Sequence, residues 1–249
     1  MRTKNYFISD VHLGLKSHEE EKQKEKRLVS FLDSVKDETA KLFIVGDLFD
    51  CWIEYRKVVP KGYYRTLAKL NEFVEAGVEV VFFSGNHDFW LNTYLKDDVG
   101  LKLVTEGLEL EINGKRFYLI HGDGLSKGDT GYKIVKKILR SRVNQFLYSL
   151  IHPDIGIKIA QSSSKKSRHQ TNEKSRGAVG MFEFAEKKIN EGFDYVIMGH
   201  FHKPQMIELK KQNGDAGFYI TLGDWINNFS YGVFENNKFE LKKLSHELH

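Results

Sequence analysis

The chain has 249 residues, of which 41% are hydrophobic and 29% charged, and a formal net charge of +4. This composition is ordinary for a soluble globular protein, and the length allows one large domain or a domain with a sizeable insertion. No apolar run approaches the roughly 20 residues that span a bilayer, and a single cysteine, Cys51, excludes an internal disulfide. Because Met1 leads directly into a strand and leaves no room for a signal peptide, we expect a cytoplasmic protein.

The first hundred residues alternate between short apolar runs and amphipathic segments. Strands are predicted at residues 6–9, 41–45 and 78–83, and the charged run 19–27 is predicted to be the solvated start of a helix. A second helix is predicted at 63–76, ended by Gly77. Alternating strands and helices favour a parallel sheet with crossover connections.

After residue 107 the pattern changes to hairpins. Residues 108–112 and 117–120 flank Asn113-Gly114, a pair typical of tight turns. The tail repeats this arrangement at 205–210 with 218–222 and at 231–234 with 238–241, after a helix at 179–191 and a strand at 195–198. A chain that is half parallel and half antiparallel predicts two sheets packed face to face, with helices outside.

Residues 126–176 fit neither pattern. Residues 127–176 carry 12 Lys and Arg but 3 Asp and Glu, a net charge of +9, so the remainder carries −5. Apolar residues recur at helical spacing from Ile134 to Ile151, Pro153 is predicted to break this helix, and residues 162–164 to form a hinge. The segment is interpreted either as a helix packed on the core or as an amphipathic cap that holds a lipid or touches a membrane.

Side chains that can bind metal follow six predicted strands, at the position where open α/β sheets form ligand sites. The segments are Ser9-Asp10-Val11-His12, Gly46-Asp47, Gly85-Asn86-His87-Asp88, His121-Gly122-Asp123, Gly199-His200-Phe201-His202 and Gly223-Asp224. Carboxylates, imidazoles and an amide without thiolates suit Mn, Fe, Zn or Co better than Ca or Mg. We therefore predict a centre with two metal ions that Asp47 bridges. The predicted ligands are Asp10, His12, Asp47, Asn86, His121, His200 and His202.

The order of these motifs, from residue 10 to residue 202, resembles the calcineurin-like metallophosphoesterases. The resemblance implies a four-layer α/β/β/α sandwich. It also implies that one ion is bound by Asp10, His12, Asp47 and His202, and the other by Asp47, Asn86, His121 and His200. Two such ions clamp the attacking and leaving oxygens of a phosphoryl displacement. Asp50, Asp88 and Asp123 are predicted to orient the ligand histidines, whereas Asp224 is interpreted either in this way or as structural.

Other segments resemble the UDP-2,3-diacylglucosamine hydrolases of lipid A synthesis. They are residues 46–53, 121–125 with Asp129 and Tyr132, 133–176 and 199–204. The resemblance implies cleavage of the pyrophosphate of UDP-2,3-diacylglucosamine to UMP and 2,3-diacylglucosamine 1-phosphate (lipid X), with water attacking the α-phosphorus. It further implies two divalent ions, with manganese (Mn²⁺) expected, and a peripheral place at the inner membrane of a Gram-negative-type bacterium. Residues 1–125 and 177–249 would form the core, and residues 126–176 the helical cap over the acyl chains.

The same resemblance implies particular site residues. Asp47, Asn86, His87 and His121 would be catalytic, and the substrate would contact Asn86, His87, Asp129, Ser167, Thr171, Lys174 and His200. Thr171 departs from the more usual Asn, and His87 stands where the best-studied branch has Arg. Because a histidine there can protonate an alkoxide leaving group, a broader phosphodiesterase acting on nucleotides or nucleic acid is the alternative. Residues 126–176 offer few aromatic side chains for stacking, so no stable nucleic-acid partner is expected.

Overall fold

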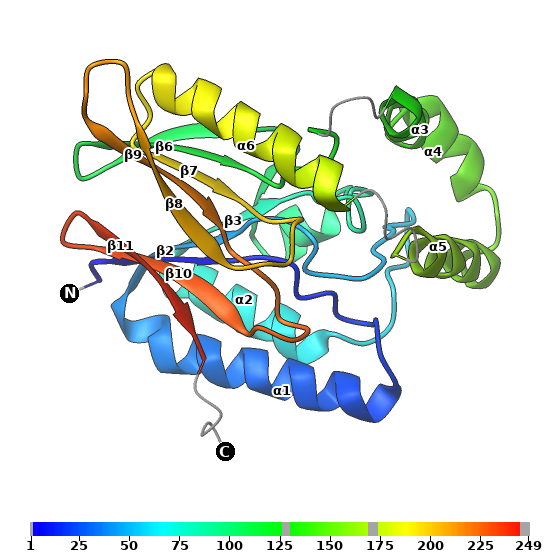
Figure 1. The fold of residues 1–249 in the computed structure, drawn as a ribbon. Coiled ribbons are helices and arrows are strands. Elements are labelled where there is room, and N and C mark those ends of the chain that lie inside the picture. The colour runs from blue at the N-terminus through cyan, green and yellow to red at the C-terminus, as the bar shows by residue number, and fades with distance from the viewer. Residues whose placement is uncertain (1, 126–129, 169–173, 245–249) are drawn as a thin grey trace.

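Two β-sheets packed face to face form the centre of the molecule (Figure 1). The computed structural model describes residues 2–125, 130–168 and 174–244. The order in the first sheet is β11 (Lys238–Lys243), β10 (Ser230–Glu235), β1 (Lys4–Ile8), β2 (Thr39–Ile44), β3 (Glu79–Phe83) and β4 (Lys102–Val104). The order in the second is β5 (Leu108–Ile112), β6 (Lys115–Ile120), β7 (Tyr195–Met198), β9 (Ala216–Thr221) and β8 (Gln205–Lys210).

Both sheets have parallel strands inside and antiparallel hairpins at an edge. Strands β1 to β4 are parallel to one another, and so are β6, β7 and β9. The three predicted hairpins are confirmed as β5 with β6, β8 with β9, and β10 with β11. The parallel strands of each sheet therefore bring their carboxyl ends to one side.

Helices cover the outer faces of both sheets and complete the predicted four layers (Figure 1). Helices α1 (His18–Val35) and α2 (Tyr64–Glu75) lie on the first sheet, and α6 (Lys174–Asn190) on the second. The chain also forms two short helical turns, η1 (Lys36–Glu38) and η2 (Tyr94–Asp98). Helix α1 buries Leu28, Phe31 and Leu32, which recur at helical spacing.

Aromatic side chains fill the space between the two sheets. Phe7 stacks on Phe43 with ring centroids 4.8 Å apart, and Phe117 stacks on Tyr195 at 4.6 Å. The rings of Phe7 and Phe117 lie 6.3 Å apart, so the stack joins the sheets. Because such interiors are close-packed, this layer fixes the two sets of strand ends relative to each other.

Three helices between β6 and α6 lie apart from the sheets, on the side toward which β1 runs (Figure 1). They are α3 (Thr130–Leu139), α4 (Arg142–Ser149) and α5 (Pro153–Arg168). Most of their large apolar side chains are exposed, with Val143 at 67% and Ile155 at 56%, which argues against the interpretation as a helix packed on the core. Among the helices of the described ranges, none combines the length and hydropathy that crossing a bilayer requires.

The boundaries of these helices also correct the sequence analysis. The single predicted helix is divided between α3 and α4, with Ser141 at the start of α4. Pro153 begins α5 instead of only ending the preceding helix, because the first turn of a helix needs no N–H from that position. The predicted hinge at residues 162–164 is wrong, since these residues lie inside α5.

Candidate metal centre

The six predicted segments meet at one edge of the sandwich. Asp10, Asp47 and Asn86 follow β1, β2 and β3 of the first sheet. His121 and His200 follow β6 and β7 of the second sheet, and Asp224 follows β9. Since both sets of parallel strands end at this edge, residues more than 200 positions apart in the chain become neighbours.

Five of the predicted ligands have a backbone conformation that residues other than glycine rarely adopt. They are Asp10, His12, Asp47, His200 and His202, with φ between 48° and 64°. A residue held in this left-handed region costs on the order of 1–3 kcal/mol, and such residues concentrate at functional sites. The surrounding layers hold these turns in place.

Glycines beside the ligands leave room for them. A Cβ atom at Gly46 would collide with the ring of His121, and one at Gly85 would collide with the carboxylate of Asp47. A Cβ atom at Gly199 would collide with Ser9. The Gly next to a ligand in these motifs is therefore required by close approach of side chains, which the sequence shows only as a recurring Gly.

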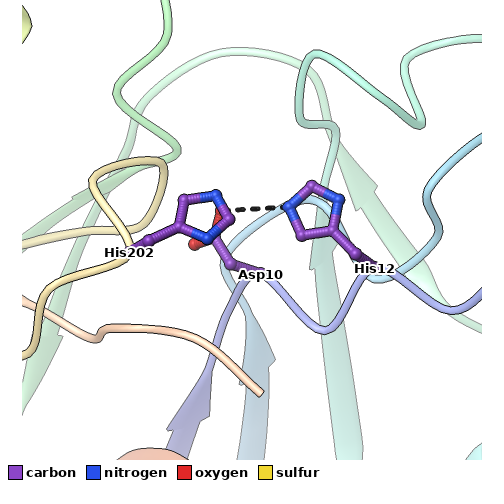
Figure 2. Close-up of side chains that lie close together, drawn as sticks. All are labelled: Asp10, His12 and His202. Carbon is purple, nitrogen blue, oxygen red and sulfur yellow. Dashed lines mark ion pairs between the residues drawn. The ribbon is translucent and has the colours of Figure 1, made fainter. Parts of the chain in front are cut away.

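Asp10, His12 and His202 form the first group of donors (Figure 2). Asp10 Oδ1 lies 3.7 Å from His12 Nε2 and 3.4 Å from His202 Nε2. Asp10 Oδ1 and His12 Nε2, which face each other, are buried and have no hydrogen-bond partner among the described residues. Buried polar atoms without partners cost about 1–3 kcal/mol each, and an ion is one way to satisfy them. This donor group therefore fits a bound cation.

Asn86, His121 and His200 form a second group with Asp47. His121 Nε2 lies 3.3 Å from Asp47 Oδ2 and 3.2 Å from Asn86 Oδ1, and His200 Nδ1 lies 3.0 Å from Asn86 Oδ1. His121 Nδ1 lies 2.9 Å from the carbonyl oxygen of Val45. A carbonyl only accepts, so we assign the ring hydrogen to Nδ1, which leaves the Nε2 lone pair for a metal.

Asp47 lies between the two groups. Its Oδ1 accepts the backbone N–H of His87, whereas Oδ2 lies 3.6 Å from His12 Nε2 and 3.3 Å from His121 Nε2. Burial opposes ionisation, but the charges of His121 and His87 hold the pKa of Asp47 well below its usual range. Burial also opposes the charge of His121, yet Asp47 raises the pKa of His121 to about 10.

Two carboxylates, Asp50 and Asp224, lie behind the first group, where they face ring nitrogens of His12 and His202. Asp50 Oδ1 lies 3.4 Å from His12 Nδ1, and Asp224 Oδ2 lies 3.4 Å from His202 Nδ1. Each carboxylate faces the nitrogen on the far side of the ring, which turns Nε2 toward Asp10. Asp224 is structural as well, because its Oδ1 accepts backbone N–H groups of the turn at residues 226–228.

The role predicted for Asp88 is wrong. Its Oδ1 accepts the backbone N–H groups of Asp47 and Gly85, and its Oδ2 accepts that of Phe49. Burial, together with the charge of Asp47, raises the pKa of Asp88 to about 7. Asp88 thus connects two ligand loops through their backbones, a role that depends on groups whose directions a sequence does not show.

The solvated helix predicted for residues 19–27 is also corrected. Lys24 and Glu25 are each only 7% exposed. Lys24 Nζ donates to the carbonyl oxygen of His12 at 2.6 Å, and Glu25 accepts the backbone N–H of Thr66 at the start of α2. Sequence reasoning missed Lys24 because a lysine within a charged run carries no signal of burial.

The predicted substrate residues are only partly described. His87 lies beside the metal centre, with its ring edge-on to His12 at 4.8 Å and Nδ1 3.0 Å from the carbonyl oxygen of Asp50. Burial lowers the pKa of His87 to about 4. The predictions for Asp129 and Thr171 lie outside the described residues, and so do the side chains of Ser167 in α5 and Lys174 in α6.

Comparison with known proteins identifies the class of this site. Residues 4–204 match the family model of the calcineurin-like phosphoesterases, and the chain belongs to that family of metal-dependent phosphoesterases, which bind divalent metal. The chain is 33% identical to a Porphyromonas gingivalis protein named UDP-2,3-diacylglucosamine hydrolase, over 98% of each chain. It is 29% identical to a protein of that name from Actinobacillus succinogenes, over 89% of this chain and 92% of the other. The solved structure of Yfce, a phosphoesterase from E. coli, covers 96% of this chain and 92% of its own, with 18% identity and a TM-score of 0.46.

Proposed function

We propose that this enzyme hydrolyses the pyrophosphate bond of UDP-2,3-diacylglucosamine and releases UMP and lipid X. The similarity to hydrolases of that name extends over nearly the whole chain, including the segment 126–176 outside the sandwich. The observation that carries the proposal beyond a general phosphoesterase is the exposed apolar surface of α3, α4 and α5. An enzyme that hydrolyses small, water-soluble esters does not need an exposed apolar surface, whereas an enzyme that binds an acylated substrate does.

The proposed metal centre holds two divalent ions, with Mn²⁺ expected from its donors. Asp10, His12, Asp47 and His202 would hold one ion, and Asp47, Asn86, His121 and His200 the other. When bound, the ions supply the charge that activates a water molecule and neutralises phosphoryl oxygens. The mixture of imidazole and oxygen donors favours Mn²⁺ over Mg²⁺ or Ca²⁺.

The surrounding residues fit attack by water on the α-phosphorus. Asp47 is held between both donor groups by the backbone N–H of His87, so its carboxylate is fixed before substrate arrives. Lipid X leaves with its phosphate as a stable anion, so no general acid is required on this side of the reaction. In this proposal His87 contacts a phosphoryl oxygen instead of protonating a leaving group.

We further propose that residues 126–176 form a cap for the acyl chains and dock at the membrane. Tyr148 of α4 packs on Trp90 with ring centroids 4.9 Å apart, and Ile157 of α5 packs on the same cluster. Most other apolar side chains of these helices are exposed, among them Phe146 at 65%. The net charge of +9 at residues 127–176 would attract anionic headgroups, which supports a peripheral position at the inner membrane of a Gram-negative-type cell.

The proposal is tested by comparing kcat/KM for three substrates. We expect UDP-2,3-diacylglucosamine to be hydrolysed at least about 100-fold better than a UDP-sugar without acyl chains, since each buried CH₂ contributes about 0.8 kcal/mol. An aryl phosphodiester is the third substrate. Rapid hydrolysis of this diester, with no turnover of the UDP-lipid, would contradict the proposal.

That outcome would instead support a broader phosphodiesterase with a nucleotide or nucleic-acid substrate. The observation in favour of this second candidate is His87, which lies beside the donor groups at a position where a histidine suits alkoxide leaving groups.

A further inference from the structure

Two basic side chains, Lys136 of α3 and Arg140 directly after the last residue of α3, reach the loops of the metal centre. Lys136 Nζ lies 2.6 Å from Asp123 Oδ2 and donates to the Asp123 carbonyl oxygen at 3.2 Å. Arg140 donates from Nη2 to the carbonyl oxygen of Gly85 at 3.1 Å and from Nη1 to that of Thr105 at 3.2 Å. Both side chains are about three-quarters buried, at 27% and 24% exposed. These contacts tie α3 to the sandwich at two points.

Each contact lies next to a proposed ligand of the second ion. Asp123 follows His121 by two residues, and the Gly85 carbonyl belongs to the peptide bond that leads to Asn86. The ligand atoms of these loops, His121 Nε2 and Asn86 Oδ1, are 3.2 Å apart. Lys136 of α3 and Arg140, the residue that follows α3, therefore contact the same two loops whose spacing sets this site.

The two faces of α3 differ in what they contact. Lys136 and Arg140 are four residues apart, so they lie on one face of the helix, and Ile134 and Ile138 lie about 200° away. These isoleucines are 55% and 51% exposed. Helix α3 thus has a basic face toward the loops of the metal centre and an exposed apolar face on the other side. A ligand that shifts the apolar face of α3 would therefore also shift the two loops that its basic face contacts.

The Asp123 carboxylate makes the contact with Lys136 costly to lose. Its side chain is 5% exposed, and Arg140 Nη2 lies 3.9 Å from the same oxygen, Oδ2. Removing one partner of a buried ion pair is more costly than the pair itself is stabilising. The position of α3 and the geometry of the His121 loop are therefore energetically linked.

We propose that Lys136 and Arg140 are positioning residues that couple the cap helices to the second metal site. Ion binding at His121 and Asn86 favours the docked position of α3, and docked α3 in turn holds both loops at ligand spacing. By the reciprocity of linkage, each event strengthens the other by the same factor. Acyl chains that contact the apolar face would then complete the metal centre, so that binding of the lipid tail raises kcat. This proposal rests on the two-ion centre proposed above.

The test measures Mn²⁺ binding by calorimetry and hydrogen exchange of residues 134–139 in the full chain. For Lys136→Gln and Arg140→Gln, we expect one of the two Mn²⁺ affinities to fall about 10- to 100-fold, the usual effect of losing a partner of a ligand loop. The other affinity should stay within about 3-fold. Mn²⁺ should slow exchange in α3 of the wild-type protein but not in these variants. Lys136→Arg should retain most of both effects.

Lys137→Gln is the matched control, because Lys137 is the next residue of α3 and is exposed. This variant should bind Mn²⁺ with wild-type affinities, and Mn²⁺ should slow hydrogen exchange in its α3 as in the wild type. Two wild-type affinities in Lys136→Gln, with the same Mn²⁺-induced slowing, would contradict the coupling alone. A wild-type protein that binds fewer than two Mn²⁺ would refute the two-ion centre, and the coupling with it.

Discussion

The sandwich and the three helices α3–α5 treat apolar side chains in opposite ways. In the sandwich, Phe7 and Phe117 are 0% exposed and stack with other rings between the sheets. In the helices, Phe146 is 65% and Val143 67% exposed. The buried apolar side chains make the sandwich rigid. This rigidity holds five of the predicted ligand residues in a strained backbone conformation. The helices leave theirs exposed, so in the proposed function chemistry and substrate selection belong to different parts of the chain.

The largest effect is expected where the sandwich presents Asp47. Asp47→Ala removes the carboxylate that lies between both donor groups, and turnover should fall by at least about 1,000-fold, because one oxyanion-hole donor alone contributes about 100- to 1,000-fold. His121→Ala should behave alike. The measurement is kcat/KM with saturating Mn²⁺. Circular dichroism should show an intact fold, and turnover within 10% of wild type would refute the shared-ligand assignment.

Matched phenylalanine truncations separate the two regions by stability. Phe117→Ala opens a cavity between the sheets and should lower the free energy of unfolding by about 3–5 kcal/mol. Phe146→Ala removes an exposed ring and should change it by at most about 0.5 kcal/mol. Denaturant titration measures both. Equal losses would mean that α4 belongs to the core, and a loss of lipid turnover in Phe146→Ala alone would support its role in substrate binding.

Metal removal should lower the stability of the sandwich by an amount between those of the preceding and following predictions. Restoring Mn²⁺ to chelated protein at 100 times its dissociation constant stabilises the folded state by about 2.7 kcal/mol per site, or a Tm rise of roughly 5–10 °C. The cause is relief of the buried, unpaired atoms of Asp10 and His12. Calorimetric scans measure the shift. A Tm unchanged by Mn²⁺, or raised more by Mg²⁺, would contradict the assignment of these donors.

The smallest effects concern two tyrosine hydroxyl groups, one within the three helices and one on the sandwich side that faces them. Tyr148 donates its hydroxyl to the carbonyl oxygen of Gly156 at 2.7 Å, so Tyr148→Phe should destabilise α4 and α5 by about 0.5–1.5 kcal/mol. The buried hydroxyl of Tyr55 has no hydrogen-bond partner within the described part of the chain. Tyr55→Phe should therefore be neutral or slightly stabilising. Hydrogen exchange of α5 compares the two variants, and the reverse order would be a contradiction.

The sandwich was predictable from sequence because its rules are local. An apolar run followed by Gly and a ligand residue marks a strand end, and parallel strands bring their ends together without further information. The positions of Asp10, Asp47 and His121 follow from this rule. The partners of Asp88 do not, since they are backbone N–H groups of loops that meet only in the folded chain.

The helices α3–α5 were less predictable because their pattern fits more than one structure. The apolar spacing from Ile134 to Ile151 is the same for one helix or for two. Ser141 alone does not indicate that one helix ends and another begins there. Pro153 is compatible with the end of one helix and with the start of the next. Spacing also cannot show whether an apolar face is covered, which decides between a core helix and a cap.

The proposed reaction is tested most directly by hydrolysis of UDP-2,3-diacylglucosamine in H₂¹⁸O with Mn²⁺, followed by mass spectrometry of both products. Attack on the α-phosphorus places the new oxygen on the phosphate that stays with uridine. We predict one ¹⁸O atom in UMP and none in lipid X. Label in lipid X, or no cleavage of this substrate by protein that has bound two Mn²⁺ ions, would contradict it.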